Sequence, residues 1–291
     1  MNNRLALGTV QFGLPYGIAN QVGQVSREEA AAILDHAWEA GIDTLDTAIA
    51  YGESEQRLGE IGVAKWRIVS KLPALQKPCK DVAGWVRESV DASLARLKVS
   101  RLSGLLLHRS QQLLSPQGGA LYRELIALKD QGKVEKIGIS IYNPEELDAL
   151  WPHYKIDLVQ APFNIIDRRL ATSGWLTRLQ QDSVEVHIRS VFLQGLLLME
   201  SAKRPAIFSR WQPLWDQWHQ WLADQALTPL QGCLGFAVSS PAVDRVIVGV
   251  DSLTQLVEIL SKARYCGVPA PAGLSSEDLD LVNPSRWVLA K

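Results

Sequence analysis

Three stretches of the chain share one pattern, a short apolar run that ends in or near a residue able to hold or move a proton. The stretches are LDTAIAYGESEQRLG at residues 45–59, IVSKLP at residues 68–73 and SGLLLHRS at residues 103–110. The proton-handling residues are Asp46, Tyr51, Lys71 and His108. A carboxylate, a phenol, an ammonium and an imidazole at successive strand ends form a set of groups suited to general acid–base catalysis.

The alternation of apolar run and amphipathic helix extends in both directions from these stretches. Expected strands cover residues 5–9, 44–46, 67–71, 102–108, 136–141, 158–162, 184–190 and 245–250. Expected helices cover residues 26–40, 54–61, 82–97, 120–131, 144–151, 174–181, 211–238 (broken at Pro229) and 253–263. Eight strand–helix repeats with buried, non-alternating strands predict an α/β fold, a single (β/α)8 TIM barrel over residues 1–291.

A doubly wound open sheet is the structural alternative to the barrel. Such a sheet is expected to carry a G-x-G-x-x-G fingerprint after its first strand, and that fingerprint does not occur there.

The sequence also indicates where the first long helix begins, because Ser26 is followed three residues later by Glu29, the pattern of a capping box.

Two segments late in the chain are rich in aromatic residues, and their sequences predict how they pack. The tryptophans of residues 211–221 follow each other in steps of four, three and three, which places them on one helical face. Packing of this face onto the barrel is the first interpretation, and lining of the substrate site is the second. The tail contains Trp287 and Val288, so we expect it to pack back onto the barrel.

Bulk composition limits the kinds of partner. The chain has 291 residues, 47% apolar and 21% charged, with a net charge of −1. This balance gives no electrostatic reason to expect nucleic acid or an anionic membrane as a partner, and no apolar run is long enough for a membrane span. The start, Met1 to Arg4, runs directly into a strand and shows no signal peptide, so a cytoplasmic location is expected. The oligomeric state is left open.

Metal binding and disulfides are not expected. Cys79, Cys233 and Cys266 are far apart and odd in number, which indicates reduced thiols. A metal site needs clustered ligands, and the sequence shows no such cluster.

The active site of a barrel lies at the C-terminal ends of its strands, so Asp46, Lys71, His108 and Tyr51 are expected on one rim. A nearby ammonium favours the phenolate, and we therefore expect Lys71 to draw the pKa of Tyr51 down toward neutrality, with Asp46 holding the lysine. His108 is expected to orient a bound carbonyl. The alternatives are a structural Asp–Lys ion pair, a turn tyrosine and a rim histidine that serves packing alone.

The chain resembles the aldo/keto reductase superfamily over nearly its whole length. The matching segments are LALGTVQFG, GIDTLDTAIAYGESEQRLG, VSKLP, LLLHRS, KVEKIGIS, VQAPFNIIDRR, RSVFLQGLL and VDRVIVGVDSLTQL, in this order. The resemblance implies a TIM barrel, NAD(P)H as hydride donor and a catalytic tetrad of Asp46, Tyr51, Lys71 and His108, with Tyr51 as acid/base. NADP(H) is the family's usual cofactor, and NAD(H) is kept as a possibility here.

The resemblance also implies a cofactor site on the rim. It places Thr9 and Asp46 under the nicotinamide ribose, and Ser140 and Gln160 against the carboxamide. Arg189 takes the place of the aromatic residue that stacks on the nicotinamide. The remaining cofactor-binding residues are Ser190, then Phe192, Gln194 and Gly195 over the pyrophosphate, and Gly249, Asp251, Gln255 and Glu258 at the adenosine end.

This chain departs from the family pattern at several cofactor positions. Ile141 follows Ser140 where an Asn is usual, and a cation at Arg189 is unfavourable beside an oxidised nicotinamide, which favours the reduced form. Residues 249–258 contain no Lys or Arg for a 2′-phosphate, and Ile259 replaces the usual Asn. The NADPH preference of the family is therefore in doubt, unless a cation from the loop after the seventh strand supplies the charge. The candidates are Lys203, Arg204 and Arg210.

The sequence is compatible with three functions. The first is an NAD(P)H-dependent reductase of a small-molecule aldehyde or ketone, with a polar, sugar-like substrate suggested by four residues expected near the rim: Tyr16, Arg109, Asn164 and Arg168. The second is a non-catalytic, cofactor-binding regulatory member of the same fold. The third is a barrel hydrolase or lyase without nicotinamide, which needs a metal cluster or a carboxylate pair on the rim.

Overall fold

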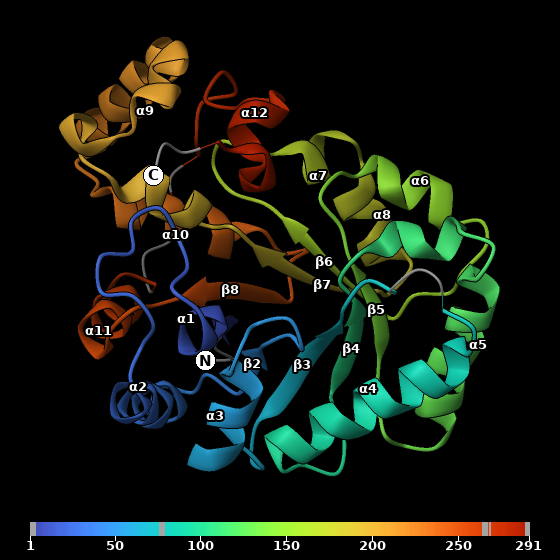
Figure 1. Ribbon diagram of the computed structural model, residues 1–291. Coiled ribbons are helices and arrows are strands. Elements are labelled where there is room, and N and C mark those ends of the chain that lie inside the picture. The colour runs from blue at the N-terminus through green and yellow to red at the C-terminus, as the bar shows by residue number, and fades with distance from the viewer. Residues whose placement is uncertain (1–3, 76–78, 264–266, 268, 289–291) are drawn as a thin grey trace.

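The eight strands form a closed parallel barrel in chain order. The computed structural model describes residues 4–75, 79–263, 267 and 269–288. The first and last strands pair with each other, from Leu5 opposite Val246 to Gly8 opposite Gly249, and this pairing closes the sheet. Figure 1 shows the helices around the outside of the strands. The predicted (β/α)8 TIM barrel is confirmed.

Each strand is followed by at least one helix. The strands are β1 (Leu5–Gly8), β2 (Thr44–Asp46), β3 (Arg67–Leu72), β4 (Gly104–Leu107), β5 (Ile137–Ser140), β6 (Leu158–Pro162), β7 (Glu185–Arg189) and β8 (Arg245–Gly249). The α-helices are α1 (Val10–Gly13), α2 (Arg27–Glu39), α3 (Ser54–Ile61), α4 (Val82–Leu97), α5 (Gly118–Asp130), α6 (Glu145–Leu150), α7 (Arg169–Thr172), α8 (Trp175–Gln181), α9 (Gln212–Asp224), α10 (Pro229–Ser239), α11 (Leu253–Lys262) and α12 (Leu279–Val282). Short 3₁₀ helices cover Ser110–Leu114, Leu193–Leu198, Ser201–Lys203, Ala206–Trp211 and Pro284–Arg286.

The barrel interior explains how the strand ends acquire polar side chains. Side chains alternate along a strand, so residues two apart face the same side. Val69, Leu106 and Leu158 form a small buried cluster of their own, separate from the large core beneath the helices. Two residues further along β3, β4 and β6 come Lys71, His108 and Gln160 in turn, which places them above the apolar cluster at the C-terminal rim.

The expected capping box at the start of α2 is only half formed. The Ser26 hydroxyl accepts from the Glu29 amide, as expected, at 3.1 Å. The Glu29 carboxylate does not reach back to Ser26; it accepts from the Leu253 amide at 2.6 Å and so ties α2 to the start of α11. The prediction of a reciprocal box was wrong because a long-range donor competes for the carboxylate.

The aromatic face of the tryptophan segment is buried, as the first interpretation states, but it packs against α10 and the preceding 3₁₀ segment and not directly on the strands. Trp215 and Trp218 are fully buried, and Trp218 stacks on Trp221 with ring centroids 5.7 Å apart. The break at Pro229 is confirmed, because this proline opens α10 after Thr228 caps it. None of these tryptophans lines the cavity described below, so the substrate-lining interpretation was wrong.

The tail is packed only in part. Trp287 packs edge-on against Phe208 at 4.9 Å, whereas Val288 is 86% exposed. Cys79 and Cys233 are free thiols, and Cys266 lies outside the described residues. Among the helices that the structure describes, none has the length and hydropathy to cross a bilayer. Within the same residues, no group of three or more His, Cys, Asp or Glu side chains is arranged to hold a metal ion.

Candidate active site

Lys71 and Asp46 form a buried ion pair at the rim. The Lys71 ammonium donates to both carboxylate oxygens of Asp46 at 2.7 Å and to the Thr47 carbonyl at 2.9 Å. The Lys71 side chain is 1% exposed, and that of Asp46 is 7% exposed. Burial lowers the pKa of Lys71, and the charge of Asp46 opposes this change. Gln160 also donates to Asp46, at 2.6 Å, so three strands meet at one carboxylate.

Tyr51 reaches this pair from the turn that follows β2. The turn depends on two glycines: Gly52 has a φ of 54°, and a Cβ at Gly13 would lie 1.8 Å from the Tyr51 carbonyl oxygen. The Lys71 ammonium lies 5.1 Å from the centroid of the Tyr51 ring. The His108 ring meets the Tyr51 ring edge-on, with centroids 5.8 Å apart.

The pKa of Tyr51 moves in the direction opposite to the expectation. Burial raises the pKa of the phenol, and the charge of Asp46 raises it further. The expectation gave most weight to the positive charge of Lys71, but burial of the phenol and the negative charge of Asp46 outweigh it. Tyr51 is therefore a protonated phenol around neutral pH, which is the form that donates a proton.

His108 is a neutral imidazole in this environment. Burial is the main cause that lowers its pKa to about 4, and the charges of Lys71 and Arg189 add to the effect. A neutral imidazole carries one N–H donor and one bare nitrogen. His108 is thus able to donate a hydrogen bond to a carbonyl oxygen without giving up a proton.

These residues open onto a cavity of about 470 Å³, within the range of small-molecule sites. All the residues predicted for catalysis and cofactor binding line this one cavity. They are Thr9, Asp46, Tyr51, Lys71, His108, Ser140, Gln160, Arg189, Ser190, Phe192, Gln194, Gly195, Gly249, Asp251, Gln255 and Glu258.

Two orphaned acceptors mark where a ligand with amide donors fits. The side-chain oxygens of Gln160 and Gln11 are buried and have no hydrogen-bond partner among the described residues. Gln160 lies opposite Ser140 in the pairing of β5 with β6, so its free oxygen and the Ser140 hydroxyl belong to neighbouring strands. A buried acceptor without a partner is costly, and a carboxamide N–H₂ provides the missing donors. The residues present therefore fit a nicotinamide at this end of the cavity.

The end of the cavity at which the resemblance places an adenosine is acidic or neutral. Asp251 accepts from the Asn20 side chain at 2.9 Å, and its amide donates to Gln255 at 2.8 Å. Among the residues that the structure describes, the cations that line the cavity are Lys71 and Arg189, neither of them in the segment of residues 249–259.

The loop after β7 supplies no cation to the cavity. Lys203 pairs with Glu200, Arg210 pairs with Asp278, and Arg204 stacks on the Trp215 ring at 4.1 Å. None of the three lines the cavity. The possibility that this loop folds a cation over a 2′-phosphate therefore has no support among the described residues.

The loops after β1 and β7 meet over the cavity. The Gln194 side chain donates to the Tyr16 hydroxyl at 3.2 Å. Backbone strain collects in the second loop, where Ser190, Leu193 and Gln194 all have positive φ. Strained non-glycine residues of this kind concentrate at functional sites, because the surrounding structure has to hold them.

Several cavity residues were not found from the sequence, and three proposed residues do not line the cavity. Gln11, Asn20, Tyr142 and Leu230 line the cavity without having been predicted. For Tyr142 a signal existed, since it follows Ser140 by two positions. Tyr16 lines the cavity as expected, whereas Arg109, Asn164 and Arg168, proposed for the substrate rim, do not.

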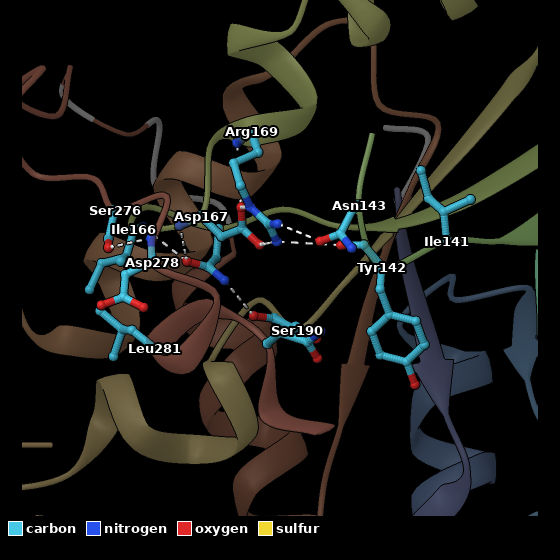
Figure 2. A network of polar contacts seen from close by, with 12 residues as sticks. Ile141, Tyr142, Asn143, Ile166, Asp167, Arg169, Ser190, Ser276, Asp278 and Leu281 are labelled. Atoms are coloured by element: carbon cyan, nitrogen blue, oxygen red, sulfur yellow. Dashed lines mark hydrogen bonds and ion pairs between the residues drawn. The ribbon is translucent and has the colours of Figure 1, made fainter. Parts of the chain in front are cut away.

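Asn164 belongs instead to a polar network behind the rim, and part of this network is drawn in Figure 2. Its side chain donates to the Ser190 carbonyl at 3.0 Å and accepts from the Asp167 amide at 2.8 Å. Arg169 forms a buried pair with Asp167 and donates to the Asn143 side chain at 2.7 Å. The network therefore holds the loops after β5, β6 and β7 against one another.

The fold and the site together define a (β/α)8-barrel enzyme with a proton-transfer cluster on its C-terminal rim. A sequence model of the Aldo/keto reductase family matches residues 4–265. The chain belongs to this family and is an oxidoreductase.

Individual relatives agree with this assignment. The chain is 27% identical over 315 residues to D-threo-aldose 1-dehydrogenase from Pseudomonas sp, covering 94% of each chain. It is 31% identical over 137 residues to 6-dehydroglucose reductase from Novosphingobium aromaticivorans, covering 42% of this chain and 44% of the relative. Among solved structures, the holo form of an aldo-keto reductase from Bacillus halodurans has the same fold, with a TM-score of 0.73 at 20% identity over 92% of this chain and 88% of that one.

Proposed function

We propose that the protein is an NAD(P)H-dependent reductase that converts a sugar-like aldehyde or ketone to an alcohol, with Tyr51 as general acid/base. The observation that carries the proposal is a protonated, half-buried phenol beside a neutral imidazole, both facing the cavity that holds the free Gln160 oxygen. The names of the relatives from Pseudomonas and Novosphingobium support a sugar as the kind of substrate. The reduced thiols are compatible with a cytoplasmic location.

Each residue of the site has a distinct role in the proposed reaction. Bound NAD(P)H supplies the hydride that reduces the carbonyl carbon. The Tyr51 hydroxyl donates its proton to the carbonyl oxygen as negative charge develops there, and a positioned acid of this kind accelerates a reaction about 10²–10⁴-fold. The His108 N–H orients the same oxygen. Lys71, fixed by Asp46, places a positive charge beside the phenolate that remains.

The function is tested by titrating the purified protein with NADH and NADPH and following nicotinamide fluorescence, then adding short aldoses and simple aldehydes. We expect binding of at least one cofactor and oxidation of the reduced form when a carbonyl compound is added. Binding without turnover over the whole panel would favour the non-catalytic, regulatory alternative. No binding of either cofactor would contradict the proposal.

The cofactor preference follows from the charges at the adenosine end. A 2′-phosphate carries nearly two negative charges, and a carboxylate ~4–6 Å away costs on the order of 1 kcal/mol in a partly screened site. Asp251 is such a carboxylate, and no cation in the described cavity lining accompanies it at this end. We expect the protein to use both cofactors, with a ratio of the two Kd values within about 10-fold.

Replacing Asp251 tests this placement of the adenosine end. Asp251→Arg is expected to shift the Kd ratio toward NADPH by about 10-fold or more, because it exchanges a repulsive charge for a bidentate donor. Asp251→Asn is the matched control that removes the charge alone, and we expect it to shift the ratio by less. A wild-type preference for NADPH above about 100-fold that neither substitution changes would show that the 2′-phosphate lies elsewhere.

A further inference from the structure

Arg189 carries a positive charge in the cavity that no carboxylate in the described structure balances. Its guanidinium donates to the Ile141 carbonyl at 3.0 Å and to the Ser190 hydroxyl at 3.3 Å, both neutral acceptors. It stacks on the Tyr142 ring, 4.6 Å from the centroid. A guanidinium has five N–H donors, so most of its hydrogen-bonding capacity is left for a ligand.

A second guanidinium lies on the same tyrosine. Arg109, the residue after His108, approaches the Tyr142 ring at 5.4 Å and forms no ion pair within the described residues. Arg109 and Arg189 therefore both contact the ring of Tyr142, and Arg109 does so from outside the cavity lining, to which Tyr142 and Arg189 belong. Cations are attracted to the face of an aromatic ring, and this attraction keeps two like charges close together without a carboxylate.

The stack is held in place from behind. Arg169 donates to the Tyr142 carbonyl at 3.4 Å and to the Asn143 side chain, and its own charge is satisfied by Asp167. Figure 2 shows Tyr142 and Asn143 on the segment that Arg169 reaches. Ser190, which accepts from Arg189, is fixed through its carbonyl by Asn164. The Arg189 guanidinium is thus preorganised, which reduces the entropy lost when it binds an anion.

The other charges of the cavity do not neutralise this end. Asp46 is engaged by Lys71, so the pair contributes little net charge. Asp251 and Glu258 belong to the segment of residues 249–259, and the hydrogen bonds of the Arg189 guanidinium go to neither of them. The charge of Arg189 does act on the catalytic groups, because it lowers the pKa of His108 and opposes the rise in the pKa of Tyr51.

We propose that the substrate is an anionic carbonyl compound, an aldehyde or ketone that also bears a carboxylate, and that Arg189 binds this carboxylate inside the cavity. This inference rests on the reductase function proposed above. A planar guanidinium and a carboxylate match in geometry and form two parallel hydrogen bonds. In the reaction, hydride from NAD(P)H and the proton of Tyr51 convert C=O to CH–OH, and the carboxylate is unchanged.

The test compares substrates that differ only in the anionic group. The pairs are succinic semialdehyde with butanal, and D-galacturonate with D-galactose. We expect wild-type kcat/KM to be at least 10-fold higher for the acid of at least one pair. Arg189→Gln should reduce this acid-to-neutral ratio by 10-fold or more, and Arg189→Lys by less. Arg109→Gln, at a residue outside the cavity lining, should reduce it by less than Arg189→Gln does, while Arg27→Gln, which changes an exposed arginine of α2, should leave it unchanged.

Binding provides a readout that does not depend on turnover. Succinate and its neutral diamide are titrated into the NADH complex. We expect succinate to bind with a lower Kd than the diamide, and we expect Arg189→Gln to raise the Kd for succinate at least 10-fold. Equal binding of the two compounds would overturn the inference even if neither substrate pair is reduced. Reduction of neutral and anionic carbonyls with similar kcat/KM would overturn it while the reductase function stands. A 10-fold loss of NADH affinity in Arg189→Gln, with the substrate ratio unchanged, would assign the charge to the cofactor instead.

Discussion

Replacing Tyr51 with Phe is expected to lower kcat for a carbonyl substrate by at least about 100-fold, the loss typical of a positioned general acid. The phenol is the group in the cluster that both carries a transferable proton and faces the cavity. Burial and Asp46 keep its pKa high, so it is protonated around neutral pH. His108 is neutral there and Lys71 is locked onto Asp46, so neither replaces it as the donor. The Kd for NAD(P)H should change little, because the substitution removes one oxygen.

Tyr16 provides a matched control for this substitution. It lines the same cavity, and its hydroxyl accepts from Gln194 on the opposite loop. Tyr16→Phe also removes one phenolic oxygen, and we expect it to lower kcat by less than about 3-fold because the Tyr16 hydroxyl is hydrogen-bonded to Gln194 and not to Asp46, Lys71 or His108. A Tyr51→Phe variant that keeps more than a tenth of wild-type kcat would show that another group is the proton donor.

The barrel was predictable from the sequence because the strand pattern, the helix pattern and the loop lengths all indicate the same fold. Buried apolar strands, amphipathic helices and short loops repeat eight times, and only a closed parallel sheet buries all of them. The ends of the strands were less predictable. The strand was expected to begin at Leu102, because this residue precedes the apolar run of residues 105–107. In the structure Leu102 makes only an isolated bridge to Val134, and β4 begins two residues later.

The sequence predicted which residues form the candidate site, but it did not predict the pKa values of those residues. Strand polarity alone placed Asp46, Lys71 and His108 on one rim. The pKa of Tyr51 could not be read from the same pattern, because it depends on burial and on how completely Asp46 neutralises Lys71. The Arg189–Tyr142 stack joins two strand ends 47 positions apart, and nothing local to either residue predicts it.

Lys71→Met is expected to lower kcat as severely as Tyr51→Phe. The ammonium lies 5.1 Å from the centroid of the Tyr51 ring, close to the phenolate that forms when Tyr51 gives up its proton. Without this charge, the phenolate in its buried site is less stable and the phenol becomes a weaker acid. The variant also leaves the Asp46 carboxylate buried without its ion-pair partner, an arrangement that costs about 3 kcal/mol of folding stability or more.

The two consequences of Lys71→Met are separable with a second substitution. Lys71→Met/Asp46→Asn removes both charges, so we expect it to recover most of the lost stability in chemical denaturation while kcat stays low. Tyr51→Phe/Lys71→Met should have a kcat similar to that of either single variant, because residues that act as one unit give non-additive losses. If the losses in kcat instead add, or if the charge-free double variant regains activity together with stability, then Lys71 serves folding or cofactor binding and does not tune Tyr51.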